Sequence, residues 1–324
     1  MLTKPVVIDG LTLHPEMAQL LALGALRPRL PLSEQTPADI RAAALRDATF
    51  AAGAPTPVYD VTDLTVDGAT GPVRARLYAP AGHWSALLVF FHGGGFVHGD
   101  VDTHDATCRL LCAAGGFAVL SVEYRLAPEH PHPAATDDAW AAWQWVLAHA
   151  ATLPGAELPD VPARVGVGGD SAGGLLAAAV CQLAERSGRP APAAQILIYP
   201  AISRAPEWPS MTLFGDGFFL TRADIEFFEA SLLGGRPDDP ADIRRHPLTG
   251  QLAGLPPALV VTGGFDPLRD GGEAYAAALT AAGTPAELIR YDGLIHGFVN
   301  MIGFSAASRA ATVDIAEATA TLLS

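Results

Sequence analysis

The stretch GVGGDSAGGLLAAA, residues 166–179, places a single serine among glycines, between an apolar run and an alanine-rich segment. It is not a dinucleotide fingerprint, because the sixth position counted from Gly166 is Ser171 rather than glycine. It is not a phosphate-binding loop either, because no lysine follows its second glycine pair. The pattern that fits is G-x-S-x-G at residues 169–173, directly after the apolar run ARVGVG of residues 163–168 and directly before a helical pattern. The stretch therefore predicts a strand that turns sharply into a helix, with Ser171 at the turn.

Such a turn explains the glycines around the serine. The central residue of a tight strand-to-helix turn has a strained backbone and crowded neighbours, so side chains at Gly169 and Gly173 would clash. Ser171 then projects its hydroxyl from the C-terminal edge of the sheet, above the positive end of the helix predicted at residues 172–187. The alternative is a glycine-rich turn without chemistry, and partners elsewhere in the chain decide between the two.

The first partner is a group of hydrogen-bond donors. A serine attacks an acyl carbon only where a base takes its proton and donors hold the resulting oxyanion. The sequence FFHGGGFVHG places Gly93, Gly94 and Gly95 directly after a strongly apolar strand, where their N–H groups can face a developing negative charge. Two of these three N–H groups, with that of Ala172, would complete an oxyanion hole, and Gly94 is the first choice. An ordinary glycine loop after a strand is the competing interpretation.

The second partner is an acid and base pair. Hydrolases with a G-x-S-x-G turn carry serine, acid and histidine in that chain order, each on a loop after a strand. Asp266 lies at the exit of the apolar run ALVVTG, and His296 lies just beyond the last predicted strand. Asp270 and Asp292 are rival acids, but Asp270 lies a helical turn further on and Asp292 lies in the turn before the histidine. The sequence therefore favours Asp266 and His296.

Other histidines are weaker candidates for the base. His98 and His104 follow the glycine loop and are candidates for a pocket wall, whereas His130 and His132 flank prolines and have the pattern of turn residues. All four precede the predicted acid. A metal cluster is the competing use of these histidines, but no H-E-x-x-H or comparable ligand spacing occurs. The sequence predicts neither a metal nor an organic cofactor.

The rest of the chain alternates between strand and helix patterns. Most of the strands after residue 86 are continuously apolar, as expected of strands covered on both faces. This alternation predicts an α/β fold with a mostly parallel eight-stranded sheet flanked by helices and an antiparallel start. The predicted strands are 58–66, 73–79, 86–91, 117–122, 163–168, 194–200, 258–263 and 286–291, and the helices between and after them are 104–114, 134–150, 172–187, 271–282 and 305–323.

Two regions do not fit this alternation, and we interpret both as a helical cap. In residues 1–50, Thr36, Pro37 and Asp39 have the pattern of the N-cap, N1 and N3 positions of a helix. Residues 201–245 are too long for an ordinary connection and are rich in aromatic residues. The core then comprises residues 51–200 and 246–324. Three of the aromatics, which line the substrate pocket or form the core of the cap, are Phe214, Phe218 and Phe219.

Composition excludes several classes of partner. The chain has 324 residues and a formal net charge of −14, which repels nucleic acid and anionic lipid. Apolar runs are too short for a membrane span, and the first residues lack a secretory signal, so we expect a cytoplasmic protein. The three cysteines match no zinc or disulfide pattern and are expected to be buried free thiols.

With these residues assembled, the chain resembles the carboxylesterases and lipases of the hormone-sensitive-lipase-like family, a branch of the α/β-hydrolase fold. The resemblance implies Ser171, Asp266 and His296 as a catalytic triad, with the glycines of residues 93–95 and Ala172 as oxyanion donors. It also implies a helical cap and a possible homodimer through the last strand and helix. The motifs that carry it are HGGGF (92–96), YRLAPEHPHPAA (124–135), GDSAGG (169–174), LPPALVVTGGFDPLRD (255–270) and IHGF (295–298).

Three positions depart from the pattern of the family. Leu175 stands where family members often carry asparagine, and Gly271 stands where an acid is common. His246 stands where a serine usually begins an SPL segment. None belongs to the predicted triad.

The function expected is hydrolysis of small-molecule esters with short to medium acyl chains through an acyl-enzyme. Hydrolysis of an amide, formamide or lactone by the same triad is one alternative. A binding protein without catalysis is another.

Overall fold

The computed structural model describes residues 5–26, 30–202 and 208–324. Its main sheet has eight strands in the order β10-β9-β8-β7-β5-β6-β4-β3. Most neighbours are parallel, and β4 is antiparallel to both β3 and β6. The predicted sheet and its antiparallel start are therefore confirmed. The strands are β3 (Asp60–Gly68), β4 (Gly71–Ala79), β5 (Leu87–Phe91), β6 (Ala118–Val122), β7 (Val165–Asp170), β8 (Gln195–Ile198), β9 (Ala258–Phe265) and β10 (Ala286–Ile295).

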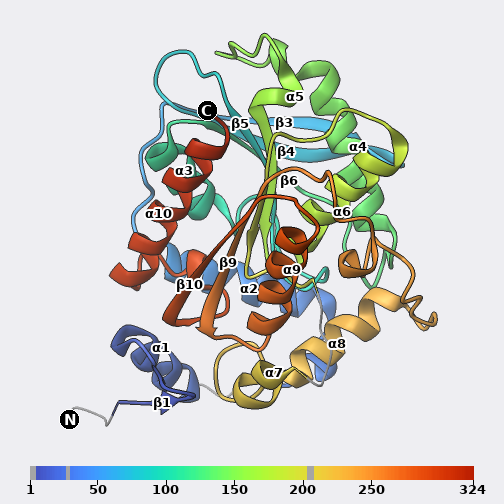
Figure 1. Ribbon diagram of the computed structural model, residues 1–324. Helices are drawn as coiled ribbons and strands as arrows, with labels where there is room; N and C mark the ends of the chain where they lie inside the picture. The colour runs from blue at the N-terminus through green and yellow to red at the C-terminus, as the bar shows by residue number, and fades with distance from the viewer. Residues whose placement is uncertain (1–4, 27–29, 203–207) are drawn as a thin grey trace.

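The central strands are apolar throughout because helices cover both faces of the sheet (Figure 1). On β5, Leu87, Val89 and Phe91 belong to one buried cluster, and Leu88 and Phe90 belong to another. This division follows from the two-residue period of a strand, which sends alternate side chains to opposite faces. The sheet therefore lies between two separate apolar layers.

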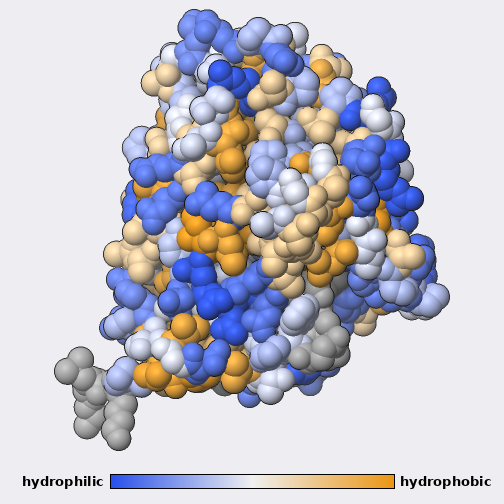
Figure 2. Space-filling view, in the orientation of Figure 1, coloured by the Kyte–Doolittle hydropathy of each residue, from blue (hydrophilic) through white to orange (hydrophobic). Residues whose placement is uncertain are grey.

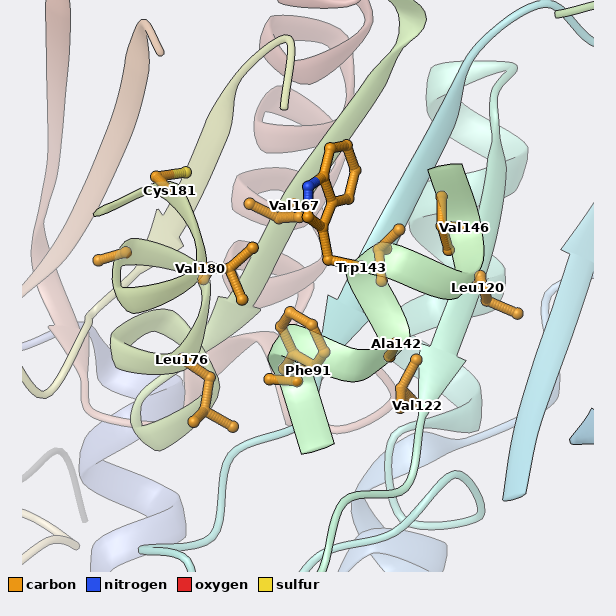
Figure 3. Packing of buried hydrophobic residues seen from close by; sticks show 14 of the residues in the cluster. Phe91, Leu120, Val122, Ala142, Trp143, Val146, Val167, Leu176, Val180 and Cys181 are labelled. Atoms are coloured by element: carbon orange, nitrogen blue, oxygen red, sulfur yellow. The ribbon is translucent and has the colours of Figure 1, made fainter. Parts of the chain in front are cut away.

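Each apolar layer is completed by its own helices. The first layer includes side chains of α4, α6 and α9, and Figure 3 shows Trp143 of α4 among Val167, Leu176 and Val180. The second layer includes side chains of α3 and α10. All five predicted core helices are confirmed, with small shifts at their ends. They are α3 (Asp105–Gly115), α4 (Ala134–His149), α6 (Ala172–Ser187), α9 (Arg269–Ala281) and α10 (Ala306–Leu322).

The two regions outside the alternation are mainly helical among the described residues. The first contains α1 and α2, and the side chain of Thr36 caps α2 by accepting a hydrogen bond from the N–H of Asp39, as predicted. The second contains α7 and α8; its residues 203–207, like 1–4 and 27–29 of the first, lie outside the described part. The helices are α1 (Pro15–Ala25), α2 (Pro37–Ala52), α7 (Pro209–Phe214) and α8 (Arg222–Leu233).

The two regions meet over the core. Ile40 of α2 is buried together with Val97 and Ala127 of core loops, and Phe227 and Phe228 of α8 pack against this group. Helices α2, α7 and α8 accordingly lie at one end of the molecule, at the bottom of Figure 1. Three features were not predicted from the sequence: helix α1, the short α5 (Val161–Arg164) and the small hairpin of β1 (Val7–Ile8) and β2 (Leu11–Thr12).

The surface drawn in Figure 2 is mixed. Apolar side chains on this face gather in small groups among hydrophilic ones. Within the described ranges, no helix combines the length and the apolar character needed to cross a bilayer.

Candidate active site

The serine turn connects β7 to α6. Ser171 has φ 55° and ψ −116°, in a sparsely populated region whose occupation costs roughly 1–3 kcal/mol. A side chain at Gly169 or Gly173 would overlap the carbonyl oxygen of Phe91 on the neighbouring strand. The predicted strain and crowding at this turn are therefore confirmed.

Ser171, His296 and Asp266 meet at the C-terminal edge of the sheet. His296 Nε2 lies 2.9 Å from Ser171 Oγ, and His296 Nδ1 lies 2.8 Å from Asp266 Oδ2. The N–H of Leu268 donates to the other oxygen of Asp266 at 2.8 Å. Asp266 is fully buried, whereas Ser171 and His296 are 9% and 6% exposed. Asp266 is therefore shielded from solvent, whereas Ser171 remains slightly exposed to it.

The rival residues have other partners. Asp270 accepts hydrogen bonds from the N–H of Ser210 and from Arg269, so it links α9 to α7. His132 pairs with Asp242 at 2.9 Å, away from the serine. Among the described residues, neither Asp270 nor His132 forms a hydrogen bond with His296, and no cluster of three or more His, Cys, Asp or Glu side chains is suited to a metal ion.

The glycine loop lies beside the serine turn because β5 pairs with β7, with Phe91 opposite Gly169. Gly94 and Gly95 have φ of 116° and 60°, values that favour glycine. The N–H of Gly93 is already used, since it donates to Asp170 Oδ1 at 2.8 Å. Of the three candidate glycines, Gly94 and Gly95 are therefore the better placed to offer N–H groups to a ligand.

A buried polar cluster beneath the site was missed by sequence analysis. Asp170 accepts hydrogen bonds from Gly93, from Tyr199 at 3.3 Å and from Asn300 at 3.2 Å, and it forms an ion pair with His104 at 3.2 Å. Burial acts to raise the pKa of Asp170, but His104 and the hydrogen bonds lower it below its ordinary value. The position of Asp170 in the GDSAGG motif was the only available signal, and Asn300 gave none.

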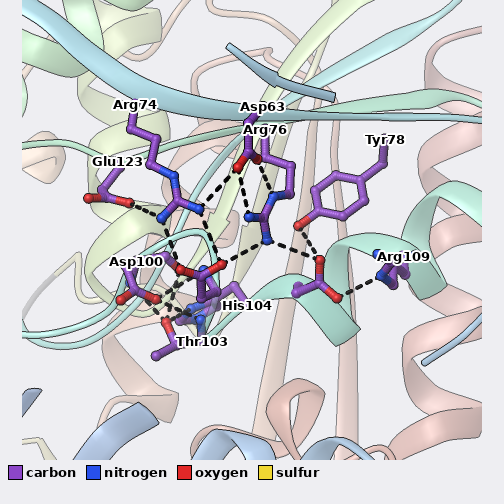
Figure 4. A network of polar contacts seen from close by, with 11 residues as sticks. Asp63, Arg74, Arg76, Tyr78, Asp100, Thr103, His104, Arg109 and Glu123 are labelled. Atoms are coloured by element: carbon purple, nitrogen blue, oxygen red, sulfur yellow. Dashed lines mark hydrogen bonds and ion pairs between the residues drawn. The ribbon is translucent and has the colours of Figure 1, made fainter. Parts of the chain in front are cut away.

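The cluster extends outward to the sheet edge, as Figure 4 shows. Thr103 links His104 at 3.0 Å to the loop of Asp100. Around the same loop, Arg74 and Arg76 of β4 bind carboxylates of several segments. The carboxylates are those of Asp63, Asp102, Asp105 and Glu123.

His92, which begins the glycine motif, is fully buried and neutral. Its Nδ1–H donates to the carbonyl oxygen of Gly93 at 2.8 Å, and its ring stacks on Tyr124 with centroids 4.2 Å apart. Burial, assisted by His104, lowers the pKa of His92 to about 3. His92 therefore shapes the glycine loop from below.

The three candidate pocket aromatics have different surroundings. Phe214 is fully buried and packs edge-on against Phe218 and beneath the guanidinium of Arg269, which leaves it no free surface. Phe219 is 49% exposed, and its ring lies 3.1 Å from where a Cβ on Gly297 would be, next to the histidine of the site. Phe214 is therefore a core residue, whereas Phe219 remains a candidate for the pocket, and Phe218 is half-buried.

Phe228 is another aromatic residue of the segment 201–245, and it lies beside the glycine loop. Its ring lies directly over Gly95, so that a Cβ on this glycine would overlap it, and its centroid is 5.7 Å from that of His98. Helix α8 therefore covers the glycine loop through Phe228.

Comparison with known proteins agrees with this architecture. A family model described as alpha/beta hydrolase fold matches residues 88–300, and the chain belongs to this family. Within the family it is a carboxylic ester hydrolase, as its relatives indicate. The carboxylic ester hydrolase LipN of Mycobacterium tuberculosis is 45% identical over 97% of this chain and 84% of its own length.

Two further relatives support the same assignment. The esterase LipI of Mycobacterium tuberculosis is 41% identical over 79% of this chain and 80% of its own length. The structure of ester-hydrolase EH1AB1, from the metagenome of Lake Arreo and complexed with a derivative of bipyridine phosphonate, is 39% identical. It superposes with a TM-score of 0.89 over 95% of this chain and 98% of that chain.

Proposed function

We propose that Ser171, His296 and Asp266 hydrolyse a carboxylic ester through an acyl-enzyme. The observation that carries this proposal is the position of His296, whose two ring nitrogens lie 2.9 Å from the serine oxygen and 2.8 Å from the buried carboxylate. A nucleophile, a base and a group that orients the base are thus in hydrogen-bond contact in the order that acyl transfer requires.

The hydrogen bonds define the tautomer of the base. The carboxylate of Asp266 accepts a hydrogen bond, so the proton of neutral His296 resides on Nδ1 and the lone pair of Nε2 faces the serine hydroxyl. The N–H of Leu268 fixes the other carboxylate oxygen and so orients the carboxylate toward the ring. Only this neutral tautomer offers the lone pair of Nε2 to the serine proton.

The reaction proceeds in two halves. Ser171 Oγ attacks the ester carbonyl while His296 takes its proton, and the tetrahedral intermediate collapses as the imidazolium protonates the departing alcohol. Water, activated by the same histidine, then attacks the acyl-enzyme and releases the carboxylic acid. We assign the oxyanion donors as the N–H groups of Gly94, Gly95 and Ala172, because the N–H of Gly93 is held by Asp170.

The cap and the substrate class belong to the same proposal. Residues 1–50 and 201–245 form the cap, and residues 51–200 and 246–324 form the core, which is supported by the apolar cluster that joins Ile40 and Phe228 above the glycine loop. Phe219 and Phe228 approach the site from the cap. We infer that they bind an acyl chain of short to medium length, in a small-molecule ester.

We also propose a homodimer through β10 and α10. Strand β10 pairs with β9 alone in the main sheet and is therefore an edge strand, which can pair with a strand of a second chain. Light scattering at micromolar concentration tests this assembly, and a monomeric mass would overturn it.

The catalytic proposal is tested with Ser171→Ala on p-nitrophenyl esters of increasing chain length. We expect kcat to fall by about 10⁴-fold or more, whereas Ser187→Ala, on the exposed end of the same helix, should retain wild-type turnover. A fluorophosphonate probe should label wild type at Ser171 and leave the alanine variant unlabelled. Turnover by Ser171→Ala equal to that of wild type would overturn the proposal, and matching anilides and lactones in the panel separate ester from amide or lactone hydrolysis.

A further inference from the structure

One side chain of the cap makes direct hydrogen bonds to the core beside the glycine loop. Arg41 of α2 donates from Nε to the carbonyl oxygen of Val97 at 2.9 Å and from Nη2 to that of Ala127 at 3.1 Å. Both bonds join the first cap segment to core loops that are more than fifty residues away in the chain. The Arg41 side chain is 33% exposed.

The two carbonyl groups belong to residues whose own N–H groups hold the glycine loop. The N–H of Val97 donates to the carbonyl oxygen of Gly94 at 3.1 Å, and the N–H of Ala127 donates to that of Phe96 at 2.8 Å. Arg41 therefore bonds on one side to the same two residues that close the loop on the other side. A shift of the guanidinium would be transmitted to Gly94 and Phe96 through a single residue in each case.

The loop needs such support because the backbone of Phe96 is strained. Gly94, Gly95 and Phe96 have φ of 116°, 60° and 64° in succession. For Phe96, which has a Cβ, a positive φ is unfavourable and persists only where surrounding contacts impose it. Those contacts include Arg41, through Ala127, and the ring of Phe228 above Gly95.

Glu129 holds the guanidinium in the required orientation. Its two carboxylate oxygens accept hydrogen bonds from Nη1 and Nη2 of Arg41 at 2.8 and 2.7 Å. A planar guanidinium can serve this carboxylate and the two carbonyls together, because its five donors form a rigid fork. A lysine ammonium cannot reproduce that geometry, although it keeps the charge.

We propose that Arg41 is a positioning residue, through which cap helix α2 holds the turn from Gly94 to Val97 in the conformation that presents the oxyanion donors. This inference rests on the function proposed above. It follows that packing of α2 against the core and assembly of the oxyanion hole occur together. When α2 separates from the core, the turn loses the hydrogen bonds of Arg41.

Arg41→Lys tests the positioning role of Arg41. Arg46→Lys is the matched control, because Arg46 lies on the same helix with an exposed side chain. We expect Arg41→Lys to lower kcat by roughly ten- to a hundredfold, the range reported for small misplacements of catalytic groups, while KM changes little. An alkylboronic acid forms a tetrahedral adduct with the serine, and its Ki should rise by the same factor as kcat falls. Arg46→Lys should match wild type in all three constants.

The kinetic constants of Arg41→Lys distinguish a positioning role of Arg41 from a purely structural one. A folded Arg41→Lys with wild-type kcat and Ki would overturn the inference, and so would a fall in kcat with an unchanged Ki, because the boronic acid adduct uses the same donors. These results would not affect the catalytic proposal. Only the turnover of Ser171→Ala can overturn that proposal.

Should Arg41→Lys fail to fold, wild type carries the test by native-state hydrogen exchange. The amide of Val97, which bonds Gly94, should lose protection at the same denaturant concentration as the amides of α2, because one opening releases both. A Val97 amide that stays protected after α2 has unfolded would refute the positioning role of Arg41.

Discussion

Asp170 and Asn300 are joined by a hydrogen bond of 3.2 Å from Asn300 Nδ2 to Asp170 Oδ2, although 130 positions separate them in the chain. Asp170 directly precedes the serine, and Asn300 lies in the short helix η4 (Phe298–Asn300) that follows the histidine. The hydroxyl of Thr107 donates to Asn300 Oδ1 at 2.7 Å and so directs the amide N–H groups toward the carboxylate. The segments that carry nucleophile and base are therefore fixed to each other below the reacting atoms.

This relationship predicts the effect of Asn300→Asp. The new carboxylate keeps its bond from Thr107 but places a second negative charge against buried Asp170, which displaces the loop of the histidine. We expect kcat to fall by about tenfold or more, with KM little changed. Steady-state kinetics on p-nitrophenyl butyrate measure both constants, and circular dichroism checks the fold. Wild-type kcat in folded Asn300→Asp would show that this bond does not position the base.

The two oxyanion glycines should differ in how their alanine variants are rescued. The nearest atoms to a Cβ at Gly94 would be those of the backbone carbonyl of His98, whereas the nearest to a Cβ at Gly95 would be ring atoms of Phe228. Each alanine variant should lose about 10²-fold in kcat. Adding Phe228→Ala should restore much of the activity of Gly95→Ala and none of that of Gly94→Ala, because a side chain can be removed and a backbone cannot.

A double-mutant cycle on kcat/KM measures this difference and corrects for the effect of Phe228→Ala alone. Equal responses of the two glycine variants to Phe228→Ala would contradict the assignment.

Buried His92 should make stability dependent on pH. Its pKa of about 3 in the fold lies below the ordinary 6.5, so at intermediate pH the unfolded chain binds a proton that the folded chain does not. Stability therefore falls as pH falls below about 6.5, by about 2 kcal/mol on reaching about pH 5.

His92→Asn removes this titrating group and its contribution to the pH dependence of stability. The amide of the new asparagine can still donate a hydrogen bond to the carbonyl oxygen of Gly93. Urea unfolding at several pH values should give a flatter dependence for the variant than for wild type. Parallel curves would show that His92 is not the group responsible.

Phe219 and Phe214 should respond differently to substitution. Phe219→Ala removes an exposed ring beside the histidine, so KM for a hexanoate ester should rise by about tenfold relative to an acetate ester, as expected for losing contact with a few methylene groups. Phe214→Leu should instead lower the free energy of unfolding by roughly 1 kcal/mol, without changing the chain-length profile. A profile altered by Phe214→Leu alone would mean that the pocket reaches deeper into the core.

The candidate triad and the order of the strands and helices could be predicted from the sequence. Ser171, Asp266 and His296 were predictable because each follows a strand whose apolar run is visible locally, and parallel strands bring their C-terminal ends to one edge. The glycines at 169 and 173 were predictable because crowding at a tight turn depends on adjacent backbone. Eight strands and the core helices follow from the same local periods of two and 3.6 residues.

Tertiary structure alone decided which groups support that chemistry. Arg41 and Asn300 act through partners in distant parts of the chain, and no local pattern marks a side chain whose hydrogen-bond acceptor lies on another segment. For the same reason the N–H of Gly93 looked as available as its neighbours until the carboxylate of Asp170 was found against it. Phe214 and Phe219 are the same residue type in one short segment, and only packing distinguishes a buried ring from an exposed one.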